Sequence, residues 1–229
     1  MNKIVIAIDG FSSTGKSTIA KKLANKLNYI YVDTGAMYRA VTYFALEHNF
    51  IGDDFFHSEK LIDNLDEITI TFKFNDIKGF AEVYLNGKNI ESDIRTLRVS
   101  QFVSPVATLS EVRRKLVEQQ QLMGKDKGIV MDGRDIGTVV FPDAELKIFM
   151  TASAKTRAKR RYNELTERGH ILSYDDVLDN VTTRDRIDST REDSPLVKAE
   201  DAIEIDNSDL TIEEQLDTIL NLASHNISK

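Results

Sequence analysis

The first thirty residues alternate between a short apolar run and a helical pattern. Ile4 to Ile8 are apolar and mostly β-branched, which is typical of a strand buried on both faces of a parallel sheet. A loop rich in Gly, Ser and Thr follows from Asp9 to Gly15, and apolar residues then recur at helical spacing from about Lys16 to Leu27. Tyr29 to Val32 is predicted as a second strand, and another helical pattern begins after Asp33-Thr34. This alternation predicts an α/β fold built on an open, mainly parallel sheet.

The pattern changes to period two between about Asp66 and Ile90. Apolar residues from Ile68 to Phe74 alternate with polar ones, and a second alternating run from Ala81 to Leu85 ends at Asn86-Gly87. Asn-Gly is a strong signal for a hairpin turn. The segment therefore predicts a small antiparallel sheet inserted into the α/β domain, with too little apolar surface to fold as a domain of its own.

The α/β pattern then resumes to the end of the chain. The predicted elements are a helix carrying Val112, Leu116, Val117 and Gln120, strands at Ile129–Met131 and Leu146–Met150, a helix from about Ala154 to Arg168, a helix after Ser173, a strand at Ala202–Ile205 and a closing helix after Thr211. We therefore expect a three-layer α/β/α fold.

Composition narrows the classes of function. The chain has 229 residues, no cysteine and a net charge of −7. The missing cysteines exclude disulfides and thiolate chemistry, and the acidic balance argues against nucleic-acid or anionic-membrane binding. The longest early apolar run is too short for a signal peptide or a membrane span, so a cytoplasmic location is expected. Positive charge is nevertheless concentrated in one stretch of arginines between Arg157 and Arg191. This stretch could bind a small anionic ligand, or it could simply be a solvated helix face.

A phosphate-binding motif lies between the first strand and the first helix. The sequence Gly10-Phe11-Ser12-Ser13-Thr14-Gly15-Lys16-Ser17 matches G-x-x-x-x-G-K-[ST]. The glycines let backbone N–H groups face a phosphate, and the helix start adds the positive end of its dipole. Lys16 supplies a charge for the β- and γ-phosphates, and the Ser17 hydroxyl can bind Mg²⁺. The motif predicts a nucleotide-phosphate site that extends to Thr18.

An acidic residue follows the predicted strand Ile129–Met131. Asp132 is placed for a Walker-B-like contact to Mg²⁺, although a helix N-cap would use the same residue type. Arg134 and Asp135 would add a guanidinium and a second carboxylate beside the phosphates.

Two further stretches have both a functional and an ordinary interpretation. In Asp33 to Arg39, Asp33 or Thr34 could simply cap a helix and Arg39 could be a surface charge, or the segment could bind a phosphate acceptor. Arg184, Asp188 and Arg191 share one helix face if the helix continues that far. They could form a solvated salt bridge or, with Arg157, Arg160 and Arg161, a second anion-binding surface.

Together these motifs resemble the bacterial-type cytidylate kinases, which are small P-loop nucleoside monophosphate kinases. The resemblance runs from about Lys3 to Ala223 and is carried most specifically by Asp132 to Ala144, DGRDIGTVVFPDA. It implies transfer of the γ-phosphoryl group of ATP to CMP or dCMP, with Mg²⁺. It also implies a single nucleotide kinase domain, 1–229. Within it we expect a core of 1–62, 100–150 and 200–229, a monophosphate-binding insert at about 63–99 and a lid at about 155–192.

The resemblance also implies roles for individual residues. Gly10 to Thr18 would bind ATP. Thr34 and Arg39 would contact the acceptor, with Arg39 and Arg134 on its phosphate. Ser104, Arg113 and Asp135 would read the cytosine edge. Arg184, Asp188 and Arg191 would hold the pentose and the phosphates. Arg157 and Arg161 would close over the transferred group, and the catalytic set would be Lys16, Arg134, Arg157, Arg161 and Arg191.

The chain departs from the family pattern within the P-loop. Relatives usually have Pro at the position of Phe11 and Gly at that of Ser13, which puts the loop conformation in question. No general base is expected, since an acceptor phosphate is already an oxyanion. Within the same fold, another nucleotide or a small hydroxyl metabolite remains an alternative acceptor. A GTP-binding switch is a second alternative, but it would need an N-K-x-D motif, whereas Asn25-Lys26 is followed by Leu27-Asn28. The expected partners are small substrates only, and the expected state is a monomer.

Overall fold

The computed structural model describes residues 2–77, 79–167 and 169–228 and divides the chain into two compact units. Unit 1 comprises Met1–Tyr31 and Gly124–Lys229, and unit 2 is the continuous segment Val32–Met123. Unit 2 contains the 63–99 segment expected as an insert, and residues of four α-helices pack with its antiparallel sheet in one core.

Unit 1 carries most of the parallel sheet. Its elements are β1 (Val5–Gly10), α1 (Lys16–Leu27), β8 (Ile129–Gly133), a π-helical turn η3 (Ile136–Val140), β9 (Leu146–Thr151), α6 (Ala154–Glu167), α7 (Tyr174–Thr190), β10 (Ile203–Asp206) and α8 (Ile212–Ile227). β2 (Ile30–Asp33) starts in unit 1 and ends in unit 2. Arg168, at the predicted end of the helix that corresponds to α6, lies outside the described residues.

The sheet places β1 at its centre. The strand order is β10-β9-β1-β8-β2, and β1 pairs in parallel with both β8 and β9. After β1 the chain forms β2 and β8 on one side of this strand, and it then crosses to form β9 and β10 on the other side. Ligands of open α/β sheets bind at such a switch point, outside the carboxyl ends of the strands. The predicted α/β fold with a mainly parallel sheet is confirmed.

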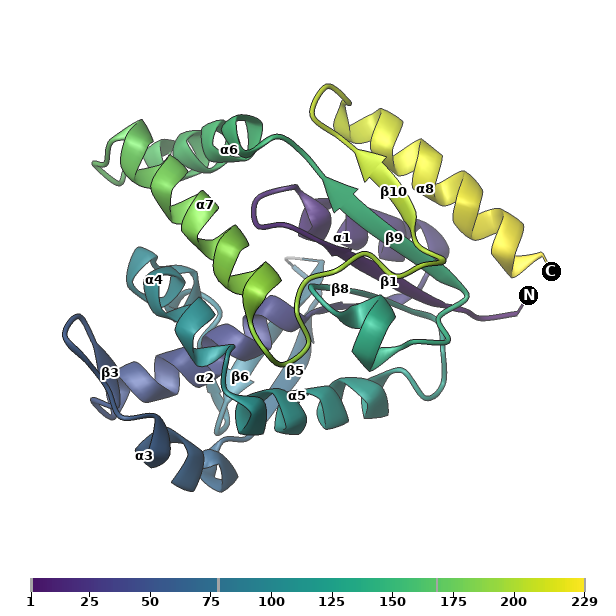
Figure 1. Cartoon of the computed structure of the whole chain (residues 1–229). Helices are drawn as coiled ribbons and strands as arrows, with labels where there is room; N and C mark the ends of the chain where they lie inside the picture. The colour runs from purple at the N-terminus through teal and green to yellow at the C-terminus, as the bar shows by residue number, and fades with distance from the viewer. Residues whose placement is uncertain (1, 78, 168, 229) are drawn as a thin grey trace. The chain divides into compact units, whose positions relative to one another are not determined.

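Side-chain alternation along β1 gives the two faces of the sheet different roles. Ile4, Ile6 and Ile8 pack in a core with residues of α1 and α8, and Figure 1 shows both helices beside the strands. Asp9, which has the opposite parity, belongs to the other face and reaches η3. The N-caps expected for the last two long helices are present, because Ser173 and Thr211 both form capping boxes.

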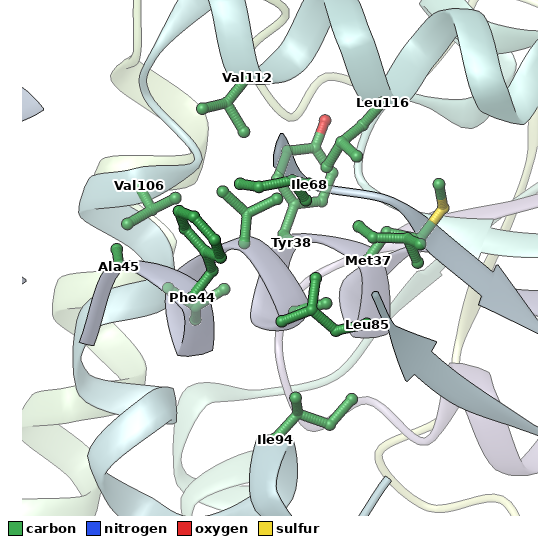
Figure 2. Close-up of a cluster of buried hydrophobic side chains, with 14 of the residues drawn as sticks. Met37, Tyr38, Phe44, Ala45, Ile68, Leu85, Ile94, Val106, Val112 and Leu116 are labelled. Atoms are coloured by element: carbon green, nitrogen blue, oxygen red, sulfur yellow. The ribbon is translucent and has the colours of Figure 1, made fainter. Parts of the chain in front are cut away.

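Unit 2 has its own hydrophobic core. Its elements are α2 (Thr34–Glu47), β3 (Ile51–Gly52), β4 (Phe55–Phe56), α3 (Ser58–Asp63), η1 (Leu65–Glu67), β5 (Ile70–Asn75), β6 (Phe80–Leu85), β7 (Lys88–Asn89), η2 (Asp93–Arg95), α4 (Leu97–Val106) and α5 (Ser110–Met123). Figure 2 shows Phe44 of α2 gathered with Leu85 of β6, Val106 of α4 and Val112 of α5. The core holds the amino end of α2, which carries candidate acceptor residues.

The predicted antiparallel sheet is present as β5-β6-β7. Leu85 pairs with Lys88 across Asn86 and Gly87, whose φ angles are 49° and 82°. Two positive φ angles in a two-residue loop define a type I′ turn, which matches the twist of the strands. The hairpin predicted at Asn86-Gly87 is confirmed.

Candidate functional site

The P-loop connects the end of β1 to the first residue of α1. A Cβ on Gly10 would lie 2.0 Å from the carbonyl oxygen of Met150 in the neighbouring strand, so a side chain here would clash with backbone. Gly15 has φ 90° and occupies the N-cap position of α1. Both glycines of the motif are therefore required by backbone geometry, and they lead the chain directly into the helix start that the sequence predicted.

Carbonyl groups of the loop accept hydrogen bonds from a lysine of the motif and from two side chains outside it. Phe11 O accepts from Lys16 Nζ at 2.6 Å, Ser12 O accepts from Arg157 Nη1 at 3.2 Å, and Thr14 O accepts from Asn207 Nδ2 at 2.6 Å. The C=O and N–H of a trans peptide point in opposite directions. Fixing these carbonyls therefore orients the N–H groups that follow them toward the opposite side, as a phosphate nest requires.

The two unusual residues of the loop are accommodated in different ways. The ring of Phe11 packs edge-on against Phe149, with a centroid distance of 6.1 Å, and lies 5.1 Å from the Arg157 guanidinium carbon. Ser13 adopts φ 60°, a left-handed conformation that costs a non-glycine residue about 1–2 kcal/mol. Phe11 thus adds packing, whereas Ser13 introduces local strain.

Lys16 is buried at the start of α1. Burial, followed by the nearby Arg134 guanidinium, holds the pKa of its ammonium well below the ordinary value. An anionic phosphate beside Lys16 would oppose both effects and raise this pKa, because its negative charge favours the charged ammonium. The lysine is therefore placed so that binding a phosphate favours its charged form.

Asp132 stands at the carboxyl end of β8 and accepts two side-chain hydrogen bonds. Ser17 Oγ donates to Oδ2 at 2.9 Å, and the Tyr31 hydroxyl donates to Oδ1 at 2.7 Å. The structure thus brings together Ser17 and Asp132, the pair expected to bind Mg²⁺. Tyr31 is an additional partner that sequence reasoning missed.

Asp9 is a second buried carboxylate that the sequence did not single out. Its two oxygens accept from the backbone N–H groups of Ile136 (2.8 Å) and Gly137 (2.7 Å) at the start of η3. Burial raises its pKa to about 7, against the lowering effect of these two hydrogen bonds. Asp9 thereby fixes the backbone that follows Asp135. Its only sequence signal was an acid at the end of an otherwise apolar strand.

Half-buried Arg134 and buried Asp188 form an ion pair in unit 1. Arg134 Nε lies 2.8 Å from Asp188 Oδ2, and Arg191 Nη1 lies 3.9 Å from Asp188 Oδ1. Burial by itself raises the pKa of Asp188, but the guanidinium groups, Arg134 first, lower it below the ordinary value. α7 ends at Thr190 with Arg191 as its C-cap. Asp188 therefore joins two arginines predicted to contact anions.

The arginines of the predicted lid differ in their surroundings. α6 and α7 pack as a helical hairpin (Figure 1). Buried Arg157 of α6 pairs through both terminal nitrogens with Asp185 of α7, at 2.9 and 2.6 Å. Arg161 pairs with Glu164 at 3.0 Å on the same helix, and Arg184 lies on α7. Arg157 thus links the two helices of the hairpin to each other.

The amino end of α2 in unit 2 carries an arginine-rich ion-pair cluster. Asp33 caps the helix by accepting from Ala36 N at 2.9 Å, which confirms the capping interpretation. It also pairs with Arg39 at 3.1 Å and Arg95 at 2.8 Å. Burial raises the pKa of Asp33, yet the two arginines outweigh burial and hold it below the ordinary range. Arg39 is therefore oriented at the helix start, and Arg95 is a neighbour that sequence reasoning missed.

The remaining acceptor candidates of unit 2 are buried. Thr34 begins α2, Ser104 lies on α4 and Arg113 on α5. Arg113 Nη1 donates to Ala107 O at 3.3 Å, at the end of α4, and its guanidinium carbon lies 5.4 Å from the centre of the Tyr38 ring. Buried polar groups of this kind are suited to reading a polar ligand edge.

The predicted site residues thus fall into two groups by unit. Unit 1 holds the P-loop together with Asp132, Arg134, Asp135, Arg157, Arg161, Arg184, Asp188 and Arg191, and unit 2 holds Thr34, Arg39, Ser104 and Arg113. Within the described residues, no group of three or more His, Cys, Asp or Glu side chains is arranged to hold a metal ion.

Comparison with known proteins decides the family. A family model described as cytidylate kinase matches residues 6–225. The chain belongs to the cytidylate kinase family. Relatives include the cytidylate kinase of Flavobacterium psychrophilum, 66% identical over 225 residues, 98% of this chain and all of the relative. That of Flavobacterium johnsoniae is 67% identical over 224 residues, 98% of this chain and 97% of the relative.

Likeness to solved structures supports the fold. The crystal structure of an uncharacterized protein from Eubacterium ventriosum superposes on this cytidylate kinase family member with a TM-score of 0.51 and 14% sequence identity. The match covers 98% of this chain and 99% of the other. Such a likeness concerns the fold alone. In the part of the chain that the structure describes, no helix combines the length and apolar character needed to span a bilayer.

Proposed function

We propose that this cytidylate kinase family member transfers the γ-phosphoryl group of ATP to CMP or dCMP, giving ADP and CDP or dCDP. The full-length match to cytidylate kinases supports the acceptor. The observation that carries the chemistry is the P-loop with buried Lys16 and the Ser17–Asp132 pair at the carboxyl ends of β1 and β8. The expected setting is the cytoplasm and a monomer, acting on small substrates rather than nucleic acid.

The donor side is assigned to the P-loop. Backbone N–H groups between Gly10 and Thr18 would bind the phosphates of ATP, and the Lys16 ammonium would neutralise charge on the β- and γ-phosphates. Ser17 and Asp132 fit a magnesium ion, because a hydroxyl and a carboxylate 2.9 Å apart are hard oxygen ligands beside a phosphate site. When bound there, Mg²⁺ would neutralise charge that develops on the phosphate oxygens.

The acceptor side is assigned to the residues that the family resemblance implies. Thr34, Arg39 and Arg134 would contact the monophosphate, and Ser104, Arg113 and Asp135 would read cytosine. A carboxylate can accept a hydrogen bond from the exocyclic amine of cytosine. Arg184, Asp188 and Arg191 would hold the pentose and phosphates. Since Arg134 and Arg191 both interact with Asp188, the pentose site and the phosphate site would be coupled.

The lid assignment uses Arg157 and Arg161 for the transferred group. Arg157 already binds Asp185 and the Ser12 carbonyl, so contact with the phosphoryl group would require it to exchange Asp185 for phosphate. An acceptor phosphate needs no general base, and catalysis would come from positioning, charge neutralisation and exclusion of water.

A panel of acceptors tests the proposal. ADP release would be followed with ATP, Mg²⁺ and each of CMP, dCMP, UMP, AMP and GMP, with shikimate and gluconate as non-nucleotide acceptors. CMP and dCMP should give the highest kcat/KM. A higher value for any other acceptor would overturn the assignment, and ATP hydrolysis that is independent of every acceptor would argue against a kinase.

A further inference from the structure

Asn207 lies outside every motif of the sequence, yet its side chain reaches the P-loop. It follows β10 directly, and its backbone N–H donates to Thr151 O at 2.9 Å at the end of β9. The side chain is buried, and Nδ2 donates to Thr14 O at 2.6 Å and to Gln215 Oε1 at 2.7 Å. Both amide hydrogens are therefore used, one on the P-loop and one on α8.

Arg160 of α6 joins the same group. Its Nη1 donates to Asn207 Oδ1 at 3.0 Å and reaches Thr14 O at 3.4 Å, while Nη2 donates to Asn207 O at 2.7 Å. Asn207 thus connects the P-loop, the lid helix α6 and the last helix in one hydrogen-bonded network. Such a network restrains all its members when every group is satisfied.

The Thr14 carbonyl has a particular importance for phosphate binding. Its peptide carries the N–H of Gly15, the N-cap residue of α1. Gly15, as the N-cap, has no side chain of its own with which to fix the helix start, and its φ of 90° lies in the left-handed region, which glycine adopts without the steric cost of a side chain. The direction of the Gly15 N–H therefore depends on what holds the Thr14 carbonyl. Asn207 Nδ2 lies 2.6 Å from this oxygen, closer than Arg160 Nη1 at 3.4 Å.

We propose that Asn207 is a positioning residue for the phosphates of the donor nucleotide. By holding the Thr14 carbonyl, it directs the Gly15 N–H into the phosphate nest, and Arg160 reinforces it from α6. This inference rests on the proposed function only in taking ATP as the ligand of the P-loop. Loss of the amide donor should reduce the fraction of molecules with a competent loop, and apparent affinity falls in proportion to that fraction.

The test compares Asn207→Asp with the control Gln215→Met. Asp is nearly isosteric with Asn and keeps an oxygen for Arg160, but it replaces the donor to Thr14 with an acceptor. Met at position 215 breaks the other hydrogen bond of Asn207 without touching the P-loop. ATP binding would be measured by calorimetry in the absence of CMP, together with the melting temperature and the KM values for ATP and CMP.

Asn207→Asp should weaken ATP binding about 10- to 100-fold, the range expected when a buried hydrogen bond is replaced by opposed acceptors. KM for ATP should rise more than KM for CMP. Gln215→Met should change ATP affinity less than about threefold, even if its melting temperature falls as much as that of Asn207→Asp. Arg160→Met, which leaves the Asn207 side chain intact, should shift ATP affinity in the same direction by a smaller factor.

ATP affinity of Asn207→Asp within twofold of wild type would overturn the inference. So would equal weakening in Gln215→Met, which would reduce Asn207 to a general stabilising residue. If Asn207→Asp does not fold, Arg160→Met decides: unchanged ATP affinity in that variant rejects the network. Wild type that binds ATP but does not phosphorylate CMP would refute the proposed acceptor and leave the inference to be judged by ATP binding alone.

Discussion

The Tyr31 hydroxyl donates a 2.7 Å hydrogen bond to the Asp132 carboxylate, on the oxygen that Ser17 does not use. One carboxylate is thus oriented by the strand β2 and by the helix α1 together. Removal of a partner that orients a metal ligand commonly costs 10- to 100-fold in metal affinity or activity.

Tyr31→Phe should therefore raise the Mg²⁺ concentration needed for half-maximal rate by about tenfold. The measurement is initial rate against free Mg²⁺ at fixed ATP and CMP. Tyr29→Phe is the matched control, because the Tyr29 hydroxyl accepts from Ile4 N at 3.1 Å, away from Asp132. Identical Mg²⁺ dependence in Tyr31→Phe and wild type would show that Tyr31 does not orient the carboxylate for metal binding.

Lys16→Met should reduce kcat at least 100-fold, the order expected when a phosphate-stabilising charge is removed. Methionine keeps most of the buried volume of Lys16, so the far-ultraviolet circular dichroism spectrum should stay unchanged. Lys22→Met, at an exposed position of the same helix, should be as active as wild type. Turnover of Lys16→Met within tenfold of wild type would contradict the donor assignment.

Arg39→Ala and Arg134→Ala should each raise the KM for CMP at least tenfold more than the KM for ATP, because a charge-assisted contact to the monophosphate is lost. Steady-state kinetics with each substrate varied in turn would measure both constants. Arg186→Ala, an exposed arginine of α7, provides the control. Equal increases in both KM values would mean that these arginines act on the fold or on both substrates.

Base selection should depend on Asp135. Its carboxylate would face the amine of cytosine but the carbonyl of uracil, and two opposed acceptors cost about 1–3 kcal/mol. CMP should therefore exceed UMP in kcat/KM by roughly 10- to 100-fold, and Asp135→Asn should narrow that ratio, mainly through lost CMP activity. Asp143→Asn, at an exposed position, should preserve it. An unchanged ratio in Asp135→Asn would place base reading elsewhere.

Asp9 gives the stability of the protein a pH dependence. Burial raises its pKa from 3.8 to about 7, so the folded chain binds this proton more tightly than the unfolded chain does. Stability contributed by the protonated form is then lost as pH rises through this window. The free energy of unfolding of wild type relative to Asp9→Asn should fall between about pH 4 and 7, by at most about 1.4 kcal/mol per pH unit, and level off above pH 7.

Urea unfolding at several pH values would measure this difference. Asp126→Asn, at an exposed position, is the control. A difference between wild type and Asp9→Asn that stays constant, or that increases with pH, would contradict the raised pKa.

Much of the fold follows from local patterns in the sequence. The predicted limits of α1 agree with the structure at both ends, and the Asn86-Gly87 hairpin and the caps at Ser173 and Thr211 were found where their chemistry required them. These features depend on neighbours in the chain. By contrast, α4 was not predicted, and the π-helical turn η3 has no side-chain period by which a sequence could indicate it.

The site shows the same division. The P-loop and Asp132 were predicted because each is defined by residues next to a strand. Tyr31, Asp9, Arg95 and Asn207 were missed because their partners lie far away in the sequence and depend on strand order or on tertiary packing. Asp9 alone had a signal in the sequence, because it is an acidic residue at the end of an apolar run that predicts a buried strand.

The central position of β1 also has a consequence for synthesis on the ribosome. β1 is made before both of its neighbours in the sheet, because Val5 pairs with Ile129 on one side and Ile6 pairs with Leu146 on the other. At about 5–20 residues per second, synthesis of the segment between β1 and its neighbouring strands takes on the order of ten seconds. Unit 2 is continuous from Val32 to Met123 and is complete before β8 is translated. During that time β1 lacks both of its partner strands, so the hydrogen bonds along its two sides and the apolar contacts of its side chains form only when β8 and β9 have been made.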